Sequence, residues 1–136
     1  MDRTVSPSIE LSKRIIIIED NADSRRMLEA MLKIDGYIVH TASDGKEGLD
    51  AILKLRPEIA IVDIGLPGLD GYQVARRVRD LQGKEDIFLI ALTGYGRPED
   101  RRAVQEAGFD EHLIKPLKPG ELPRALAEAA ARRKRG

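Results

Sequence analysis

The chain has 136 residues, of which 42% are hydrophobic and 34% are charged, as in a folded globular protein. This length predicts one domain with a core of its own. The 23 lysines and arginines balance the 23 aspartates and glutamates, so net charge points to neither nucleic acid nor membrane as a partner. The absence of cysteine excludes a disulfide framework and agrees with a reducing cytoplasm. No apolar run is long enough to span a bilayer and the N-terminus has no signal-peptide core, so we expect a cytoplasmic protein.

Short apolar segments alternate with amphipathic segments along most of the chain. The β-branched run IIIIE at 15–19 predicts a strand that is buried on both faces. The helical spacing of apolar residues over 24–36 predicts a helix that Gly36 ends. By the same criteria we expect further strands at 37–42, 58–63, 86–93 and 109–114, and further helices at 44–55, at 72–82, after residue 98 and within 118–133.

Two local signals refine the helix starts. Asp44 and Glu47 form a capping-box-like pair at the start of the second helix. The last helix contains Pro119 and Pro123 near its beginning. Because an interior proline costs about 3 kcal/mol, this helix is expected to begin between them.

Five successive strand–helix units predict the α/β class, with a parallel sheet and helices on both of its faces. This arrangement is a three-layer sandwich. We expect one domain over residues 14–133, preceded by a flexible lead-in at 1–13 and followed by a basic tail at 134–136.

Polar residues stand where the predicted strands end. Glu19 and Asp20 end the first strand, Asp63 ends the third, Thr93 ends the fourth, and Lys115 follows the fifth. Ligands of parallel sheets bind beyond these strand ends. The three carboxylates carry −3, which Mg²⁺ and one lysine would neutralise, and Mg²⁺ prefers oxygen ligands. A phosphoryl group would there meet a metal, an ammonium and a hydroxyl, with a carboxylate as nucleophile.

The segments IIIIEDN, IVDIGLPGLDGYQVARRVR, IALTGYG and AGFDEHLIKPL closely resemble the receiver domains of two-component response regulators. The resemblance extends over about residues 14–133. It implies a flavodoxin-like (βα)5 fold with strand order 2-1-3-4-5. It also implies that Asp63 accepts a phosphoryl group from a histidine kinase or a histidine phosphotransfer protein, and that a downstream protein target reads the change.

The same resemblance assigns roles around Asp63. Asp20, Asp63 and the backbone carbonyl of Gly65 would bind Mg²⁺ directly, and Glu19 would bind it through water. Thr93 would hydrogen-bond the phosphoryl group and Lys115 would pair with it. The resemblance also makes the Lys115–Pro116 peptide bond a candidate for the cis form, against about 5% of X–Pro bonds in general.

His112 departs from the family pattern, in which a Tyr or Phe usually stands at this position and moves inward together with the threonine. His112 is therefore a candidate switch residue beside Thr93. A polar, titratable ring costs more to bury than Phe does, so a surface position without a sharp switching role is the simpler expectation.

Alternatives accompany this interpretation. By themselves, Glu19 and Asp20 are more simply a solvated strand end, and the terminal RRKR complements a helix dipole better than it indicates nucleic acid. A phosphorylation-independent interaction module is the second hypothesis. An aspartyl-nucleophile phosphatase is the third, but it would usually need a second acid where Gly65 stands. We expect a signalling switch rather than a turnover enzyme, present as a monomer or weak homodimer, without direct contact to nucleic acid or membrane.

Overall fold

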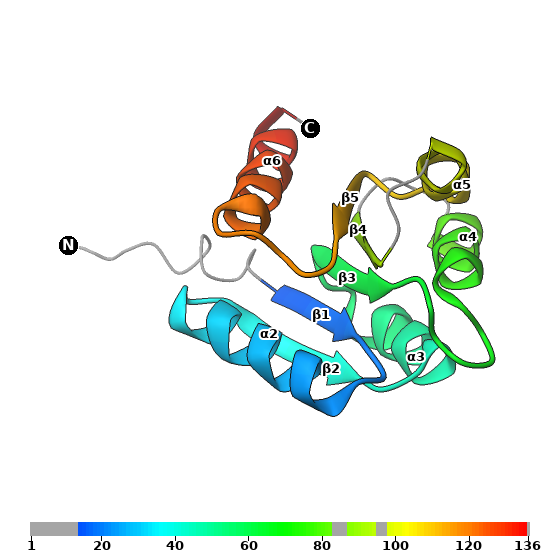
Figure 1. Cartoon of the computed structure of the whole chain (residues 1–136), viewed down its shortest axis with the longest axis horizontal. Coiled ribbons are helices and arrows are strands. Elements are labelled where there is room, and N and C mark those ends of the chain that lie inside the picture. The colour runs from blue at the N-terminus through cyan, green and yellow to red at the C-terminus, as the bar shows by residue number, and fades with distance from the viewer. Residues whose placement is uncertain (1–13, 83–86, 95–97, 136) are drawn as a thin grey trace.

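The computed structural model describes residues 14–82, 87–94 and 98–135, which form a parallel sheet with helices on both faces (Figure 1). The strand order is β2-β1-β3-β4-β5. The α/β class and the predicted order 2-1-3-4-5 are therefore confirmed. In chain order the elements are β1 (Arg14–Ile18), α2 (Ala22–Ile34), β2 (Ile38–Ala42), α3 (Gly45–Leu55), β3 (Ile59–Asp63), α4 (Gly71–Gln82), β4 (Phe88–Thr93), α5 (Pro98–Ala107), β5 (Glu111–Ile114) and α6 (Glu121–Arg135).

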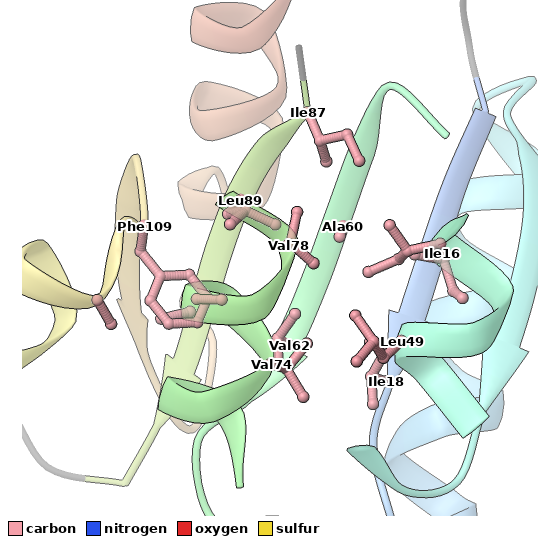
Figure 2. Close-up of a cluster of buried hydrophobic side chains, with 14 of the residues drawn as sticks. Ile16, Ile18, Leu49, Ala60, Val62, Val74, Val78, Ile87, Leu89 and Phe109 are labelled. Carbon is pink, nitrogen blue, oxygen red and sulfur yellow. The ribbon is translucent and has the colours of Figure 1, made fainter. Parts of the chain in front are cut away.

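Two apolar cores lie on opposite faces of the sheet. Helices α3, α4 and α5 pack over one face, where their side chains meet those of the strands (Figure 2). Helices α2 and α6 pack over the other face. Ile16 and Ile18 belong to the first core, and Ile15 and Ile17 belong to the second. The run of isoleucines is continuous because β1 is covered on both sides.

Side-chain caps determine where two helices begin. Helix α2 starts two residues earlier than predicted, because the Asn21 side chain accepts the backbone N–H of Ser24 at 2.9 Å. Helix α3 starts as predicted, with Asp44 accepting the N–H of Glu47 at 2.7 Å. The Glu47 carboxylate in turn accepts the N–H of Ser43, also at 2.7 Å, so it binds the residue before the cap.

The last elements differ slightly from their predicted bounds. Helix α6 begins between the two prolines, as predicted, but it runs to Arg135 rather than ending at 133. Strand β5 begins two residues later than predicted, because the N–H of Phe109 donates to Val104 of α5. The predicted lead-in at 1–13 lies outside the described residues. None of the described helices has the length and apolar character needed to cross a bilayer.

A charged cluster joins several elements at the amino-terminal ends of the strands, on the side of the sheet away from Glu19, Asp63 and Lys115. The Arg79 guanidinium donates to the carbonyls of Ile87 and Gly108 at 2.8 and 2.9 Å and to the Asp110 carboxylate at 2.8 Å. Asp110 also accepts the backbone N–H of Leu89 at 2.9 Å and pairs with Arg132. The cluster therefore ties α4, α6 and the segments that lead into β4 and β5 to one another.

We predict that Arg79→Met lowers the free energy of unfolding by about 2–3 kcal/mol, because it leaves two carbonyls and a largely buried carboxylate without this donor. Urea unfolding of the full chain measures the change. Arg26→Met is the matched control, since its ion pair with Asp23 is exposed and should contribute little. Equal stability of the two variants would contradict the prediction.

Candidate functional site

The register of the parallel strands brings four polar side chains together at the carboxyl ends of the strands. Strand β3 ends at Asp63 and β4 ends at Thr93, while Glu19 directly follows β1 and Lys115 directly follows β5. The strands pair without large offsets, so their carboxyl ends are level with one another. Residues that span almost a hundred positions of sequence therefore meet at one place.

Three carboxylates lie close together at these strand ends. Single oxygens of Glu19, Asp20 and Asp63 all lie within 4.8 Å of one another. Glu19 is fully buried and Asp63 is 8% exposed, whereas Asp20 is exposed to solvent. The cluster is thus enclosed on the side of the sheet and open on the side of Asp20. Such an arrangement holds a cation while leaving some of its coordination positions to water or a ligand.

The Lys115 ammonium lies between the two buried acids. Its Nζ is 2.9 Å from Glu19 Oε1 and 3.2 Å from Asp63 Oδ2. Burial alone would lower the pKa of Lys115, but the hydrogen bond that its ammonium donates to Glu19 and the charge of Asp63 outweigh this effect, so the pKa is raised. Lys115 therefore stays charged and compensates part of the negative charge.

Both carboxylate oxygens of Glu19 accept hydrogen bonds. One carboxylate oxygen binds Lys115, and the other accepts the backbone N–H of Asn21 at 3.1 Å. Burial raises the pKa of Glu19, and the Asp63 carboxylate adds to this, while Lys115 and the Asn21 N–H oppose it without cancelling it. Glu19 is thus a positioned but electrostatically unfavourable carboxylate until a further cation arrives.

The loop after Asp63 is shaped by close backbone contacts. The Gly65 N–H donates to Asp63 Oδ1 at 3.0 Å, which orients the carboxylate. Gly71 closes the loop, because its N–H donates to the Ile64 carbonyl and a Cβ there would lie 2.7 Å from the Asp63 carbonyl oxygen. A residue with a side chain could not take this position without moving the acid.

Thr93 and His112 lie on neighbouring strands beside the cluster. Thr93 is buried, and its carbonyl accepts the backbone N–H of Lys115 at 2.7 Å. His112 pairs in register with Ala91 and lines a cavity of about 310 Å³ under α5. The histidine is half-buried and only partly at the surface, and its role as a switch stays a prediction. The peptide bond between Lys115 and Pro116 is cis in the structure.

Two residues that the sequence analysis did not single out also contact the cluster. Asn21 caps α2 and donates its N–H to Glu19, and Arg25 donates to the Glu19 carbonyl oxygen at 2.9 Å. The Asn21 cap has a sequence signal, since an Asn before a helical pattern is a common helix start. Arg25 has none, because its position depends on how α2 packs against β1.

The donor set fits a magnesium ion. The three carboxylates carry −3 and Lys115 carries +1, which leaves −2, the charge that one Mg²⁺ neutralises. All the available ligands are hard oxygens, and they are few enough for the ion to keep several waters.

The sequence profile of the response regulator receiver domain matches residues 15–127. The chain belongs to this family. It is 38% identical over 114 residues to an uncharacterised 14.6 kDa protein of Leptolyngbya boryana, covering 84% of this chain and 87% of that protein. It is 37% identical over 121 residues to a probable transcriptional regulator, ycf27, of Guillardia theta, covering 89% of this chain and 46% of that regulator.

A solved structure agrees with the family. The CheY-like response regulator receiver domain protein of Methanospirillum hungatei superimposes with a TM-score of 0.83 at 29% identity, covering 91% of this chain and 98% of that chain. Receiver domains are signalling modules of two-component systems rather than enzymes of metabolism. The acidic pocket and Lys115 lie at the carboxyl ends of the strands of this receiver domain.

We predict that the pKa of Glu19 rises further in Lys115→Met and falls when Mg²⁺ is added to the wild type. The lysine hydrogen bond lowers this pKa, so its loss leaves burial and Asp63 unopposed. Carbon-detected NMR titration of the side-chain carboxyl measures the pKa. The stability that protonation of Glu19 contributes is present below its ordinary pKa of 4.5 and is lost as the pH rises through the raised, folded-state value. An unchanged pKa in Lys115→Met would refute this account.

Proposed function

We propose that this receiver domain is the phospho-accepting switch of a two-component phosphorelay. In this proposal Asp63 takes a phosphoryl group from a histidine kinase or a histidine phosphotransfer protein in the presence of Mg²⁺. The observation that supports it best is the Lys115 ammonium between Glu19 and Asp63, beside a cluster of three carboxylates. A structural role alone would not require three carboxylates so close together at the carboxyl ends of the strands.

Four residues hold the Mg²⁺ ion in this proposal, three directly and one through water. Asp20, Asp63 and the Gly65 carbonyl are the direct ligands in this proposal, and Glu19 acts through water. When bound, Mg²⁺ supplies positive charge that stabilises the phosphoryl oxygens during transfer. The open side at Asp20 leaves room for the donor group to approach.

The transfer itself needs one bond to form and one to break. An Asp63 oxygen forms a bond to phosphorus while the donor's N–P bond breaks, and the electron pair leaves with the imidazole nitrogen. Lys115 offsets the charge that accumulates on the phosphoryl oxygens. The product is an acyl phosphate on Asp63 and a histidine without its phosphoryl group on the donor.

The phosphorylated site would act on its neighbours through Thr93, whose hydroxyl lies on β4 next to β3. A hydrogen bond from this hydroxyl to the phosphoryl group would shift the end of β4. His112 is paired to the same strand and faces α5, so it would respond to that shift. A target protein would read the altered face, and the family supports a cytoplasmic location for both partners.

We predict that Mg²⁺ with beryllofluoride shifts the amide NMR signals of residues 63, 93 and 115 in the wild type. Asp63→Asn should abolish these shifts and also phosphorylation by acetyl phosphate, because the amide is a poor nucleophile. Asp23→Asn is the matched control, since that acid is exposed in the first turn of α2 and should leave both responses intact.

No response of the wild type would refute the proposed function. A target that binds equally well with and without acetyl phosphate would favour the phosphorylation-independent interaction module instead.

We also predict slow to moderate self-dephosphorylation, because Gly65 has no side chain to position a hydrolytic water. A Cβ at Gly65 would lie 3.7 Å from Asp63 Oδ1, which is an ordinary van der Waals contact, so the site accepts a Cβ there. Gly65→Asn should shorten the phosphoryl half-life about fivefold, as expected for one added hydrogen bond of about 1 kcal/mol to the water. Gly65→Ala should not shorten it. Decay of radiolabelled phosphoprotein measures the half-life, and a wild-type value of a few seconds would contradict the prediction.

A further inference from the structure

Arg25 contacts the backbone of the metal site rather than its carboxylates. It lies near the start of α2 and is half-buried. Its Nη1 donates a hydrogen bond of 2.9 Å to the carbonyl oxygen of Glu19. This carbonyl belongs to the peptide unit that joins Glu19 to Asp20. The guanidinium therefore fixes the one peptide that separates two of the three acids.

The segment of residues 19–21, called here the acidic turn, is held at both ends. At its start, the Glu19 N–H donates to the Ala42 carbonyl at 3.0 Å. At its end, the Asn21 carbonyl accepts the N–H of Arg25 at 2.9 Å. Arg25 thus contacts the acidic turn twice, once through its backbone and once through its guanidinium. The side-chain contact is the one that a substitution removes without altering the helix.

We propose that Arg25 is a positioning residue for the metal site, acting through the Glu19 carbonyl. The hydrogen bond prevents rotation of the peptide between Glu19 and Asp20. Both carboxylates then keep the spacing of 4.8 Å or less from Asp63 that a shared cation requires. This inference rests on the proposed function, because it assigns Arg25 to the Mg²⁺ that the function needs.

An electrostatic role and a positioning role of Arg25 predict opposite changes in Mg²⁺ affinity when the residue is replaced. Removing a positive charge near an acidic cluster strengthens the attraction for a cation, so a purely electrostatic role predicts tighter Mg²⁺ binding in Arg25→Gln. A positioning role predicts weaker binding. Arg25→Lys separates the two further, because lysine keeps the charge but has a shorter reach and no planar fork of donors.

The experiment measures Mg²⁺ affinity of the full chain by calorimetric titration in four proteins: wild type, Arg25→Gln, Arg25→Lys and Arg26→Gln. We expect both Arg25 variants to bind Mg²⁺ about five- to tenfold more weakly, as for loss of one hydrogen bond of ordinary strength. Arg26→Gln should stay within twofold of the wild type, since Arg26 is exposed and pairs only with the exposed Asp23 among the described contacts. In the metal-free proteins, the amide signals of Asp20 and Asn21 should shift in both Arg25 variants and not in the control.

The outcomes distinguish this inference from the proposed function. Wild-type Mg²⁺ affinity in Arg25→Lys, or tighter binding in Arg25→Gln, would overturn the positioning role while leaving the function in place. Failure of the wild type to bind Mg²⁺ would overturn the function itself. Arg25→Lys keeps the charge and the aliphatic part of the side chain, so it provides a folded variant if Arg25→Gln loses its structure, and its amide spectrum shows whether the rest of the fold is unchanged.

Discussion

The ion pair of Lys115 with Glu19 and Asp63 is the interaction on which the arrangement of the site depends. Glu19 lies 96 residues before Lys115 in the sequence, and Asp63 lies 52 residues before it. A fully buried carboxylate is unfavourable without a cation, and a second carboxylate beside it adds repulsion. The fold brings a cation to the two carboxylates only when the carboxyl ends of β1, β3 and β5 lie on the same side of the sheet. The parallel direction of the strands and the charge balance of the site are therefore mutually dependent.

The order of strands and helices was predictable because a parallel sheet imposes a simple pattern. Its strands are buried on both faces, so they appear as uninterrupted β-branched runs, as in Ile15–Ile18. The helix bounds were less predictable, because side-chain caps and loop contacts decide them. The cap formed by Asn21 moves the start of α2, and the hydrogen bond from Phe109 to α5 delays β5.

The site was predictable in its members but not in its details. Parallel strands place their carboxyl ends at one edge whatever their order, so Glu19, Asp63 and Lys115 could be expected to meet. Which acid is buried depends on helix packing, and the sequence gives no signal for it. The same holds for His112, whose half-burial follows from the position of α5 over β5. Arg25 was missed for this reason also.

The shared lysine links phosphorylation of Asp63 to the end of β4 in the proposed switch. One ammonium serves two carboxylates, and its residue also donates its backbone N–H to the Thr93 carbonyl. An acyl phosphate on Asp63 would carry more negative charge than the carboxylate it replaces, so it would draw the ammonium away from Glu19. Any such movement acts on the end of β4 through the Thr93 hydrogen bond. Glu19 would then depend on the metal for compensation, which couples the ion, the phosphoryl group and the strand ends in one charge balance.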